Sequence, residues 1–329
     1  MTEHNLQQDY SRLTDSAGYV RLVSHYRLRS EGKDRKQQLN GLCTADIKKM
    51  ESGDVVEAFV LNEKGRVLGH AHVLNLDDHL ILTGHGNQAD TLIGHLDKYV
   101  IREDVQYHKE TDQTAGFFVR GKQAAACLKT IFTQVPEINR VVPQTLEISG
   151  ENRDFTVAQL ELAGWGFLIL TTADHVNDFE GVLGKAGIEK CSPNALDSIR
   201  IESGTPWFGL DFDDSNLPQD LQRDDKAISF TKGCYLGQET VARVDAMGRL
   251  NNLFVRFEIQ DETSEPRPLK QDDKKAGRLT SVAYSPAKNS YVGLGYVKRK
   301  FKEPGTVVDG VVVNHPWDPF EQESDDPKG

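Results

Sequence analysis

Cysteine is scarce in this sequence, and its few copies lie far apart. Cys43, Cys127, Cys191 and Cys234 form no Cys-x-x-Cys pair, so no stretch offers the ligand spacing of a zinc or iron–sulfur site. Four free thiols are the expected state in a reducing compartment. We predict no resident metal site.

Long apolar runs are also missing. No stretch reaches the length that crosses a bilayer. Residues 1–10 are polar and have neither the apolar core of a secretory signal nor the arginine-rich pattern of a transit peptide. The sequence therefore predicts a cytoplasmic protein that does not bind membranes.

Positive charge is in the minority. The 329 residues include 39 Lys and Arg against 50 Asp and Glu, which gives a net charge of −11. Such a surface repels phosphate backbones and anionic lipid, so general nucleic-acid binding is not expected, although a local basic pocket stays open. The preferred interpretation of the short basic run at residues 298–302 is a solvated strand end, and an RNA contact is the minor alternative.

The first 248 residues combine helices with hairpins, and the chain length predicts two or three domains. Asn62-Glu63-Lys64-Gly65 should join two strands, because a late glycine supplies the positive φ that closes such a connection. The predicted strands cover residues 55–61, 66–74, 80–82, 156–162 and 166–171. The predicted helices cover residues 34–42, 87–99, 123–132, 174–185 and 193–203.

The pattern changes in residues 249–315. Short strands recur at 253–259, 277–283, 293–297 and 307–313, and this spacing indicates a small β-barrel or sandwich. Residues 316–329 form an acidic tail that we expect to be disordered. The mixture of antiparallel hairpins and helices predicts an α+β protein rather than a doubly wound sheet.

One segment gathers polar groups around two glycines: Lys232-Gly-Cys-Tyr-Leu-Gly-Gln-Glu239. Glycine lets a backbone approach a ligand closely, and an ammonium group near Cys234 would favour its thiolate. A carboxylate can accept two parallel hydrogen bonds from an aminopyrimidine edge such as that of a pterin, and a tyrosine ring can stack on it. We therefore expect these groups to converge on one cavity. The competing interpretation is a surface turn that leads into a helix.

This octapeptide resembles the signature of the YgfZ branch of the folate-binding T-protein superfamily, which also includes the aminomethyltransferase of the glycine cleavage system. Other stretches resemble the superfamily in the same order. They are residues 32–35, 38–46 and 61–66 near the start, residues 198–209 upstream of the signature, and residues 277–281 and 293–298 in the barrel. The resemblance covers roughly residues 20 to 313.

The resemblance implies two mixed α/β modules within residues 1–248, whose interleaving stays open, and a C-terminal barrel. These parts form a cloverleaf around a central opening that binds tetrahydrofolate or a derivative. Cys234 and Lys232 are then the candidate catalytic residues. The candidate cofactor-binding residues are Gly233, Tyr235, Gly237, Gln238, Glu239, Asp34, Arg35, Asn62, Arg66 and, more weakly, Arg200 and Glu202.

The sequence departs from the transferase at two places. The transferase has a catalytic acidic residue soon after its first hairpin turn, whereas residues 66–70 here read Arg-Val-Leu-Gly-His. Its second module has a Gly-Glu turn, whereas Gly164-Trp165-Gly166 stands here. We therefore doubt that this chain transfers an aminomethyl group.

These features predict a folate-binding accessory protein that supports iron–sulfur cluster assembly or repair and, through it, tRNA modification. Its expected partners are folate and iron–sulfur proteins or their assembly factors, and we expect a monomer. One alternative is a tetrahydrofolate-dependent one-carbon transferase or demethylase. Another is an interaction module with a vestigial pocket.

Two further patterns point elsewhere. Residues 83–89 fit G-x-G-x-x-A, but the hairpin-rich order around them argues against dinucleotide binding. His70 and His72 share one face of a strand, as metal ligands do. No third ligand is evident, and a solvated polar face explains the two histidines better.

Overall fold

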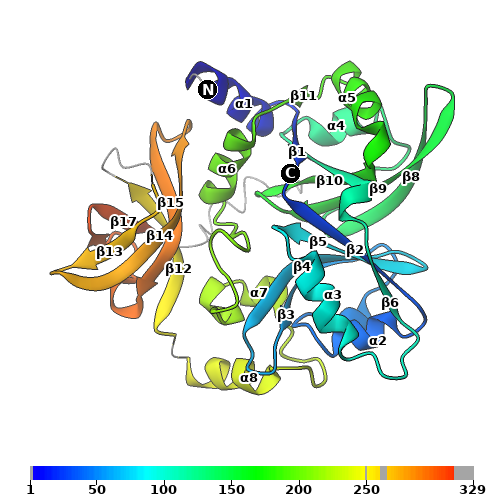
Figure 1. The fold of residues 1–329 in the computed structure, drawn as a ribbon. Helices are drawn as coiled ribbons and strands as arrows, with labels where there is room; N and C mark the ends of the chain where they lie inside the picture. Colours follow the sequence, from blue (N-terminus) through cyan, green and yellow to red (C-terminus); the bar gives the residue numbers. More distant parts are fainter. Residues whose placement is uncertain (1–2, 249, 260–264, 315–329) are drawn as a thin grey trace.

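The chain folds into two sheet-based units and a barrel, which surround the segment that contains helix α6 (Figure 1). The computed structural model describes residues 3–248, 250–259 and 265–314. The predicted α+β class and the C-terminal barrel are both confirmed. Among the described helices, none combines the length and the apolar character that a membrane span requires.

The first sheet has five antiparallel strands in the order β3-β4-β5-β2-β6. Helices α2 and α3 cover one face, where Leu39, Leu92 and Leu96 pack on Leu28 and Val73. The strands are β2 (His25–Glu31), β3 (Val55–Leu61), β4 (Val67–Asn75), β5 (His79–His85) and β6 (Gln106–Lys109). The helices are α2 (Arg35–Asn40), η1 (Ile47–Lys49) and α3 (Ala89–Asp97).

The second sheet has six strands in the order β11-β1-β7-β10-β9-β8. Its strands are β1 (Gly18–Leu22), β7 (Thr114–Arg120), β8 (Arg140–Ile148), β9 (Glu151–Glu161), β10 (Trp165–Thr172) and β11 (Glu189–Lys190). Its helices are α1 (Glu3–Thr14), η2 (Thr111–Gln113), α4 (Ala124–Leu128), η3 (Ala173–His175) and α5 (Val176–Lys185). Strand β1 precedes all strands of the first sheet, so the chain crosses between the sheets at residues 23–24 and returns before β7.

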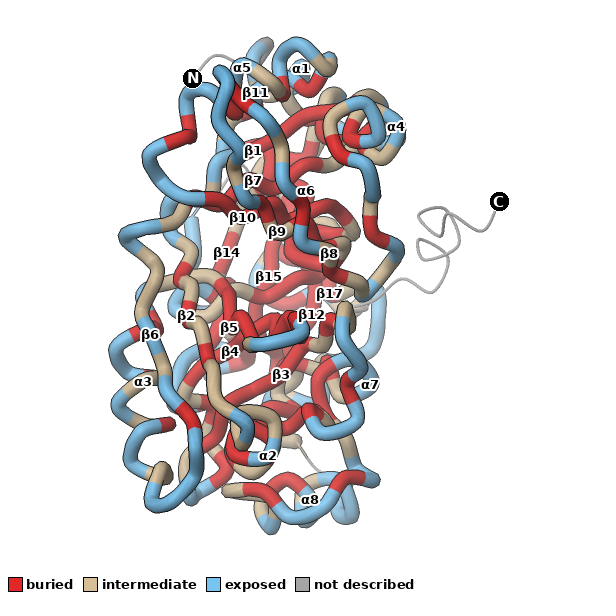
Figure 2. The backbone as a smooth tube through the Cα atoms, turned by 90° about the vertical axis from the view of Figure 1, so that its right-hand side faces the viewer, coloured by how far each residue is buried: buried red, intermediate tan, exposed pale blue. Residues whose placement is uncertain are grey.

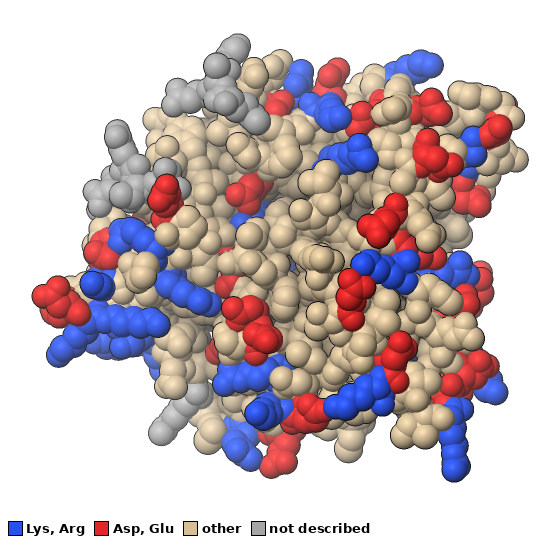
Figure 3. All heavy atoms as spheres, viewed as in Figure 1, with Lys and Arg blue, Asp and Glu red and all other residues tan. Residues whose placement is uncertain are grey.

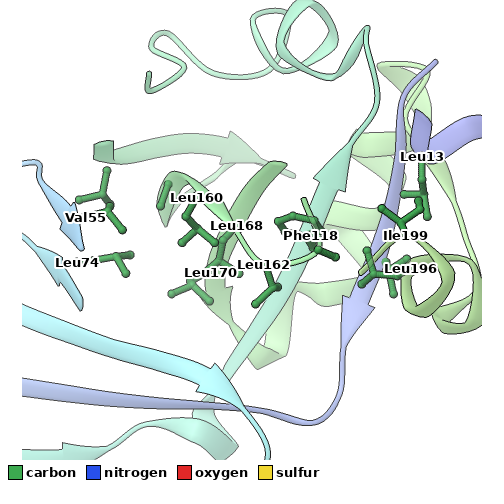
Figure 4. Close-up of a cluster of buried hydrophobic side chains, with 14 of the residues drawn as sticks. Leu13, Val55, Leu74, Phe118, Leu160, Leu162, Leu168, Leu170, Leu196 and Ile199 are labelled. Carbon is green, nitrogen blue, oxygen red and sulfur yellow. The ribbon is translucent and has the colours of Figure 1, made fainter. Parts of the chain in front are cut away.

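A shared apolar core holds the two sheets and α6 (Pro193–Glu202) together. Figure 4 shows Val55 and Leu74 of the first sheet beside Leu160 and Leu170 of the second, with Ile199 of α6 at the far side of the same cluster. Burying apolar side chains from three elements in one cluster stabilises their relative positions. The opposite face of the second sheet packs on α4 and α5 through its own cluster, which includes Phe117 and Phe179.

The C-terminal sheet has the order β13-β14-β15-β12-β17-β16 and curls into a nearly closed barrel. Arg267 Nη1 pairs with Asp309 Oδ2 at 2.6 Å, and the Lys270 backbone N–H donates to the same oxygen, which joins the two ends of the sheet. The strands are β12 (Asn252–Ile259), β13 (Pro268–Gln271), β14 (Lys274–Ser285), β15 (Ser290–Lys298), β16 (Val307–Val308) and β17 (Val311–Asn314). The short helix η5 (Arg299–Phe301) follows β15.

The prediction of one strand over residues 307–313 is wrong. Asp309 and Gly310 have φ of 52° and 79° and form a turn between β16 and β17. Two consecutive residues with positive φ are typical of a tight hairpin connection. The other barrel strands lie close to their predicted positions. The predicted acidic tail lies outside the described residues.

The segment between the second sheet and the barrel contains η4 (Pro218–Leu221), α7 (Asp224–Ala227) and α8 (Gln238–Met247). The strands in the interior are buried, while α3 and α8 lie at the periphery with exposed outer faces (Figure 2). Helix α8 therefore presents most of its length to solvent, and the octapeptide leads directly into it.

Candidate functional site

The octapeptide at residues 232–239 lies along the first sheet unit, beside the end of α2. The Leu236 N–H donates to the Gly41 carbonyl at 2.9 Å, and the Ser229 N–H donates to the Thr44 carbonyl at 2.9 Å. Gly237 has φ of 78° and precedes the first residue of α8. The segment is thus held by backbone hydrogen bonds at two points before the helix begins.

Lys232 is buried and points into the first sheet unit. Its Nζ donates to the carbonyls of Asn40, Cys43 and Ala45 at 2.7, 2.9 and 2.5 Å. Burial lowers the pKa of Lys232, although the three carbonyls satisfy every N–H of the ammonium group. No hydrogen is left for the Cys234 sulfur, so the structure does not support the expected role of Lys232 in favouring the thiolate.

Cys234 and Gly233 are exposed, whereas Tyr235 is buried. The Tyr235 ring packs in the apolar cluster where the first sheet, α6 and the barrel meet, together with Phe59 and Phe254. Burial raises the pKa of Tyr235 to about 12. The ring is therefore largely enclosed by protein, with Lys232 Nζ 4.9 Å from its centroid, and its stacking on a ligand stays a prediction.

Gln238 and Glu239 begin α8 and lie away from the buried lysine. The Glu239 carboxylate is exposed and accepts from Arg243 Nη2 at 3.0 Å, one helical turn later. An exposed pair at this spacing contributes only a few tenths of a kcal/mol. The octapeptide residues line none of the four described hollows. The predicted convergence on one cavity is not observed, because Lys232 points inward and Glu239 outward.

The residues predicted from the N-terminal motifs shape loops. Asn62 Oδ1 accepts from the Lys64 and Arg66 N–H groups at 2.9 and 3.0 Å and so closes the hairpin turn. Asp34 Oδ2 accepts from the Asp104 N–H at 2.9 Å, and Arg35 donates to the Gly32 and Asp77 carbonyls. Only Arg66 among them faces a described hollow, which lies beside the barrel.

Arg200 and Glu202 also have structural partners. Arg200 is buried and donates to Asp197, Asp211 and Ser281 at 2.6, 2.7 and 2.7 Å, which links α6 to the barrel. Glu202 accepts from the Tyr10 hydroxyl at 2.5 Å and so contacts α1. Both residues therefore connect α6 to neighbouring elements.

A buried polar cluster in the interior was not predicted. Glu57 of β3 accepts from Arg223 Nε at 2.5 Å and contacts His70 Nε2 of β4 at 2.8 Å. Burial alone would raise the pKa of Glu57, but Arg223 and His70 outweigh it and hold this pKa well below its usual value. The available signal was one glutamate inside the apolar run of residues 55–61.

The cluster extends to the second sheet. Glu161 of β9 accepts from Lys226 at 2.5 Å and lies 3.6 Å from Arg223 Nη2. His72 is buried nearby, and burial lowers its pKa to about 4. The prediction that His70 and His72 lie on a solvated face is wrong, because both side chains are buried and the His70 ring packs between Phe59 and Phe212. Within the described ranges, no three His, Cys, Asp or Glu side chains gather as metal ligands.

A hollow of about 210 Å³ lies where the chain crosses between the two sheets. Leu22 and Leu170 line it from the second sheet, and His25 and Thr83 line it from the first. The His25 Nε2 atom is buried and has no hydrogen-bond partner within the described residues. Burial, with the nearby His85, lowers the pKa of His25 to about 3, so the ring is neutral at physiological pH.

Comparison with known proteins identifies the fold. The glycine cleavage T-protein N-terminal domain model matches residues 2–224, and the T-protein C-terminal barrel model matches residues 253–316. The structure is similar to the glycine cleavage system aminomethyltransferase T from Bartonella henselae, with a TM-score of 0.77 and 20% identity. That match covers 94% of this chain and 87% of the other, and at this identity it shows the fold alone.

Sequence relatives carry two kinds of name. A chloroplastic protein of Arabidopsis thaliana, named as a transferase by inference, is 24% identical over 90% of this chain and 70% of its own length. The tRNA-modifying protein YgfZ of Yersinia enterocolitica is 27% identical, and that of Yersinia pestis 28%. Each YgfZ match covers 66% of this chain and 63% of the relative. Because the family model spans more than half of the sequence, the chain belongs to the glycine cleavage T-protein family.

Proposed function

We propose that this chain is a folate-binding accessory protein that supports iron–sulfur cluster assembly or repair and, through it, tRNA modification. The observation that carries the proposal is the match of both T-protein models, which together span nearly all described residues. The relatives named tRNA-modifying protein YgfZ add the link to tRNA modification. The accessory role rests on the absence of a carboxylate at the start of β4.

The hollow where the chain crosses between the two sheets is the proposed binding site for the ring system of tetrahydrofolate or a derivative. Its volume of about 210 Å³ suits a bicyclic ring, with the rest of the molecule extending outward. The unpartnered Nε2 of His25 offers a neutral hydrogen-bonding group to a polar ring edge, and Leu22 and Leu170 offer apolar contacts. The residues present thus fit a polar, flat heterocycle.

The interior carboxylates are poorly placed to hold a pterin. Glu57 is engaged by Arg223 and His70, Glu161 by Lys226, and Asp211 by Arg200. A ligand would have to break a buried ion pair to reach any of them, which leaves an uncompensated charge. Recognition through His25 and the walls of the hollow requires no such loss.

Cys234 is the proposed point of contact with the iron–sulfur partner. Its thiol is exposed on a segment that Lys232 and the Leu236 N–H hold in place. A fixed, accessible thiol can coordinate the iron of a partner's cluster transiently as the thiolate. Lys232 acts in this proposal as a positioning residue.

The transferase alternative has less support. Strand β4 begins Val67-Leu68-Gly69-His70, and His70 is bound to Glu57 in the interior. Trp165, the first residue of β10, stands where the transferase has glutamate. The name of the Arabidopsis relative keeps this alternative worth an assay.

Calorimetric titration with tetrahydrofolate tests the binding step. The protein should bind with measurable heat, Leu170→Trp should abolish binding by filling the hollow, and Cys234→Ala should bind as the unmodified protein does. In cells, Cys234→Ala should lower iron–sulfur enzyme activity without loss of folded protein. No heat and no thermal shift with tetrahydrofolate would leave the interaction module as the function. Turnover of a methylamine donor would instead favour the transferase.

A further inference from the structure

A hollow of about 390 Å³ lies between α8, the loop before η4 and the barrel. Four cationic side chains line it: Arg66, Lys275, Arg278 and Lys298. A more open hollow of about 580 Å³ shares Lys275 and Lys298 with it and adds Arg299 and Lys300. We call these six residues and the two hollows between them the basic trough.

The cations of the inner hollow are not paired with carboxylates in the part of the chain that the structure describes. Within the described residues, none of the four forms an ion pair with a carboxylate, and Arg66 instead donates to the Ser215 carbonyl. Asp220 also lines the hollow, but it accepts from the Leu217 N–H at 2.9 Å, and burial raises its pKa. The hollow therefore presents an excess of positive charge.

A buried donor points to the same conclusion. Tyr296 lines the inner hollow and is 4% exposed, and its hydroxyl has no hydrogen-bond partner in the described part of the chain. The Arg278 guanidinium lies over the Tyr296 ring at 4.8 Å. Burial raises the pKa of Tyr296, so the hydroxyl stays protonated and can donate. An unmade buried hydrogen bond is costly unless a ligand completes it.

The trough is positively charged, whereas the whole chain is negatively charged. The net charge is −11, yet lysine and arginine side chains gather over the barrel at the left of the molecule (Figure 3). A basic site on an acidic protein attracts an anion locally while the rest of the surface repels it. An anion is therefore expected to bind at the trough rather than elsewhere on the surface.

We propose that the basic trough binds the phosphodiester backbone of an RNA strand. Six cations spread over two adjoining hollows match several spaced phosphates, whereas a single free phosphate would occupy only the inner hollow. Asn251 and Asn252 lie in both hollows and offer amide donors and acceptors beside the cations. The basic run at residues 298–302 thus has a binding role rather than being only a solvated strand end.

Fluorescence anisotropy with a labelled single-stranded RNA of about 12 nucleotides tests the proposal. With about four phosphates contacted, the logarithm of the affinity should fall with the logarithm of salt concentration at a slope near −3. The double variant Lys275→Glu/Lys298→Glu should lose at least about tenfold in affinity and about half of that slope. Tyr296→Phe, which removes only the hydroxyl, should lose about three- to tenfold.

The matched control is Lys129→Glu/Lys185→Glu, which changes the net charge equally at two exposed lysines of the second sheet unit. Its affinity for RNA should stay within about twofold of that of the unmodified protein, because the change in overall charge has only a small effect away from the trough. Equal losses in both double variants would overturn the proposal, as would full competition by a polyglutamate peptide or RNA affinity below detection. Tetrahydrofolate titration of the trough variants should be unchanged, because the trough and the crossing hollow share no residue.

Discussion

Gly65 and Gly237 lie directly against each other, one in the first hairpin turn and the other at the end of the octapeptide. Both have positive φ, 74° and 78°. A Cβ built on Gly237 would lie 2.7 Å from the Gly65 Cα and 2.7 Å from the Asn62 carbonyl oxygen. Two motifs far apart in the sequence thus meet through their backbones, and neither position has room for a side chain.

Gly237→Ala should lower the free energy of unfolding by about 1–3 kcal/mol, because the added methyl group combines a left-handed backbone with a clash against main-chain atoms. Urea unfolding measures this. The matched control is Gly233→Ala in the same octapeptide, where a Cβ meets nothing within 4 Å. Its cost should stay within about 0.5 kcal/mol, and equal costs at both glycines would contradict the packing described here.

Lys232→Met should loosen the octapeptide from the first sheet unit, because three carbonyls lose their charged donor. We expect a loss of about 2–4 kcal/mol in unfolding free energy. Hydrogen exchange should also speed up at the Ser229 and Leu236 amides, which bond to Thr44 and Gly41. Lys48→Met, at an exposed lysine, is the control. Unchanged exchange at both amides in Lys232→Met would show that the ammonium does not hold the segment.

The native protein should contain one fast-reacting thiol. Cys234 is exposed, whereas Cys43 and Cys191 are buried and burial raises the pKa of each, that of Cys191 to about 12. Alkylation followed by mass spectrometry should modify Cys234 at least about tenfold faster than these two. Cys234→Ala should remove the fast phase. Early modification of Cys43 would argue against the described burial.

Stability should fall in mild acid partly through His72. Burial holds its folded pKa at about 4, below the ordinary value of 6.5. Between pH 6.5 and pH 4, His72 therefore binds a proton in the unfolded chain but not in the folded chain. The contribution of neutral His72 to the free energy of unfolding is complete above pH 6.5 and is lost as the pH falls toward 4. Over that window the unfolding free energy should fall by up to about 1.4 kcal/mol per pH unit more than in His72→Gln. Parallel slopes for the two proteins would exclude this source.

The buried ion pair between Glu57 and Arg223 should show strong coupling. Arg223→Met leaves the Glu57 carboxylate in the interior with less compensation, so we expect a loss of about 3–5 kcal/mol. Adding Glu57→Gln should cost much less than the sum of the two single changes. Additive losses in this double-mutant cycle would mean that the two charges do not stabilise each other.

The sequence predicted best those features that depend on neighbouring residues. The turn at Asn62–Gly65, the start of α6 at Pro193 and most barrel strands follow from local turn chemistry and from proline at a first helical position. The Asp309-Gly310 turn is equally local, but the valines on both sides of it favour one continuous strand in the sequence. Helix α3 covers Ala89–Asp97, two residues shorter at each end than the predicted range of 87–99.

The direction of side chains could not be predicted in the same way. His70 and His72 alternate correctly along β4, but the elements that bury them come from other parts of the chain. Lys232 and Glu239 are seven residues apart by number, yet one enters the first sheet unit and the other faces solvent. Only the position of the octapeptide between α2 and α8 decides this.

The crossing of the chain between the two sheets has a consequence for synthesis on the ribosome. Strand β1 pairs with β7, as Gly18 with Arg120, so it emerges long before its partner exists. The whole first sheet, up to β6, is translated in between. Strand β1, with the apolar residues Tyr19 and Val20, therefore stays unpaired in the nascent chain while the first sheet forms. Chaperone contact during translation should concentrate on this first segment.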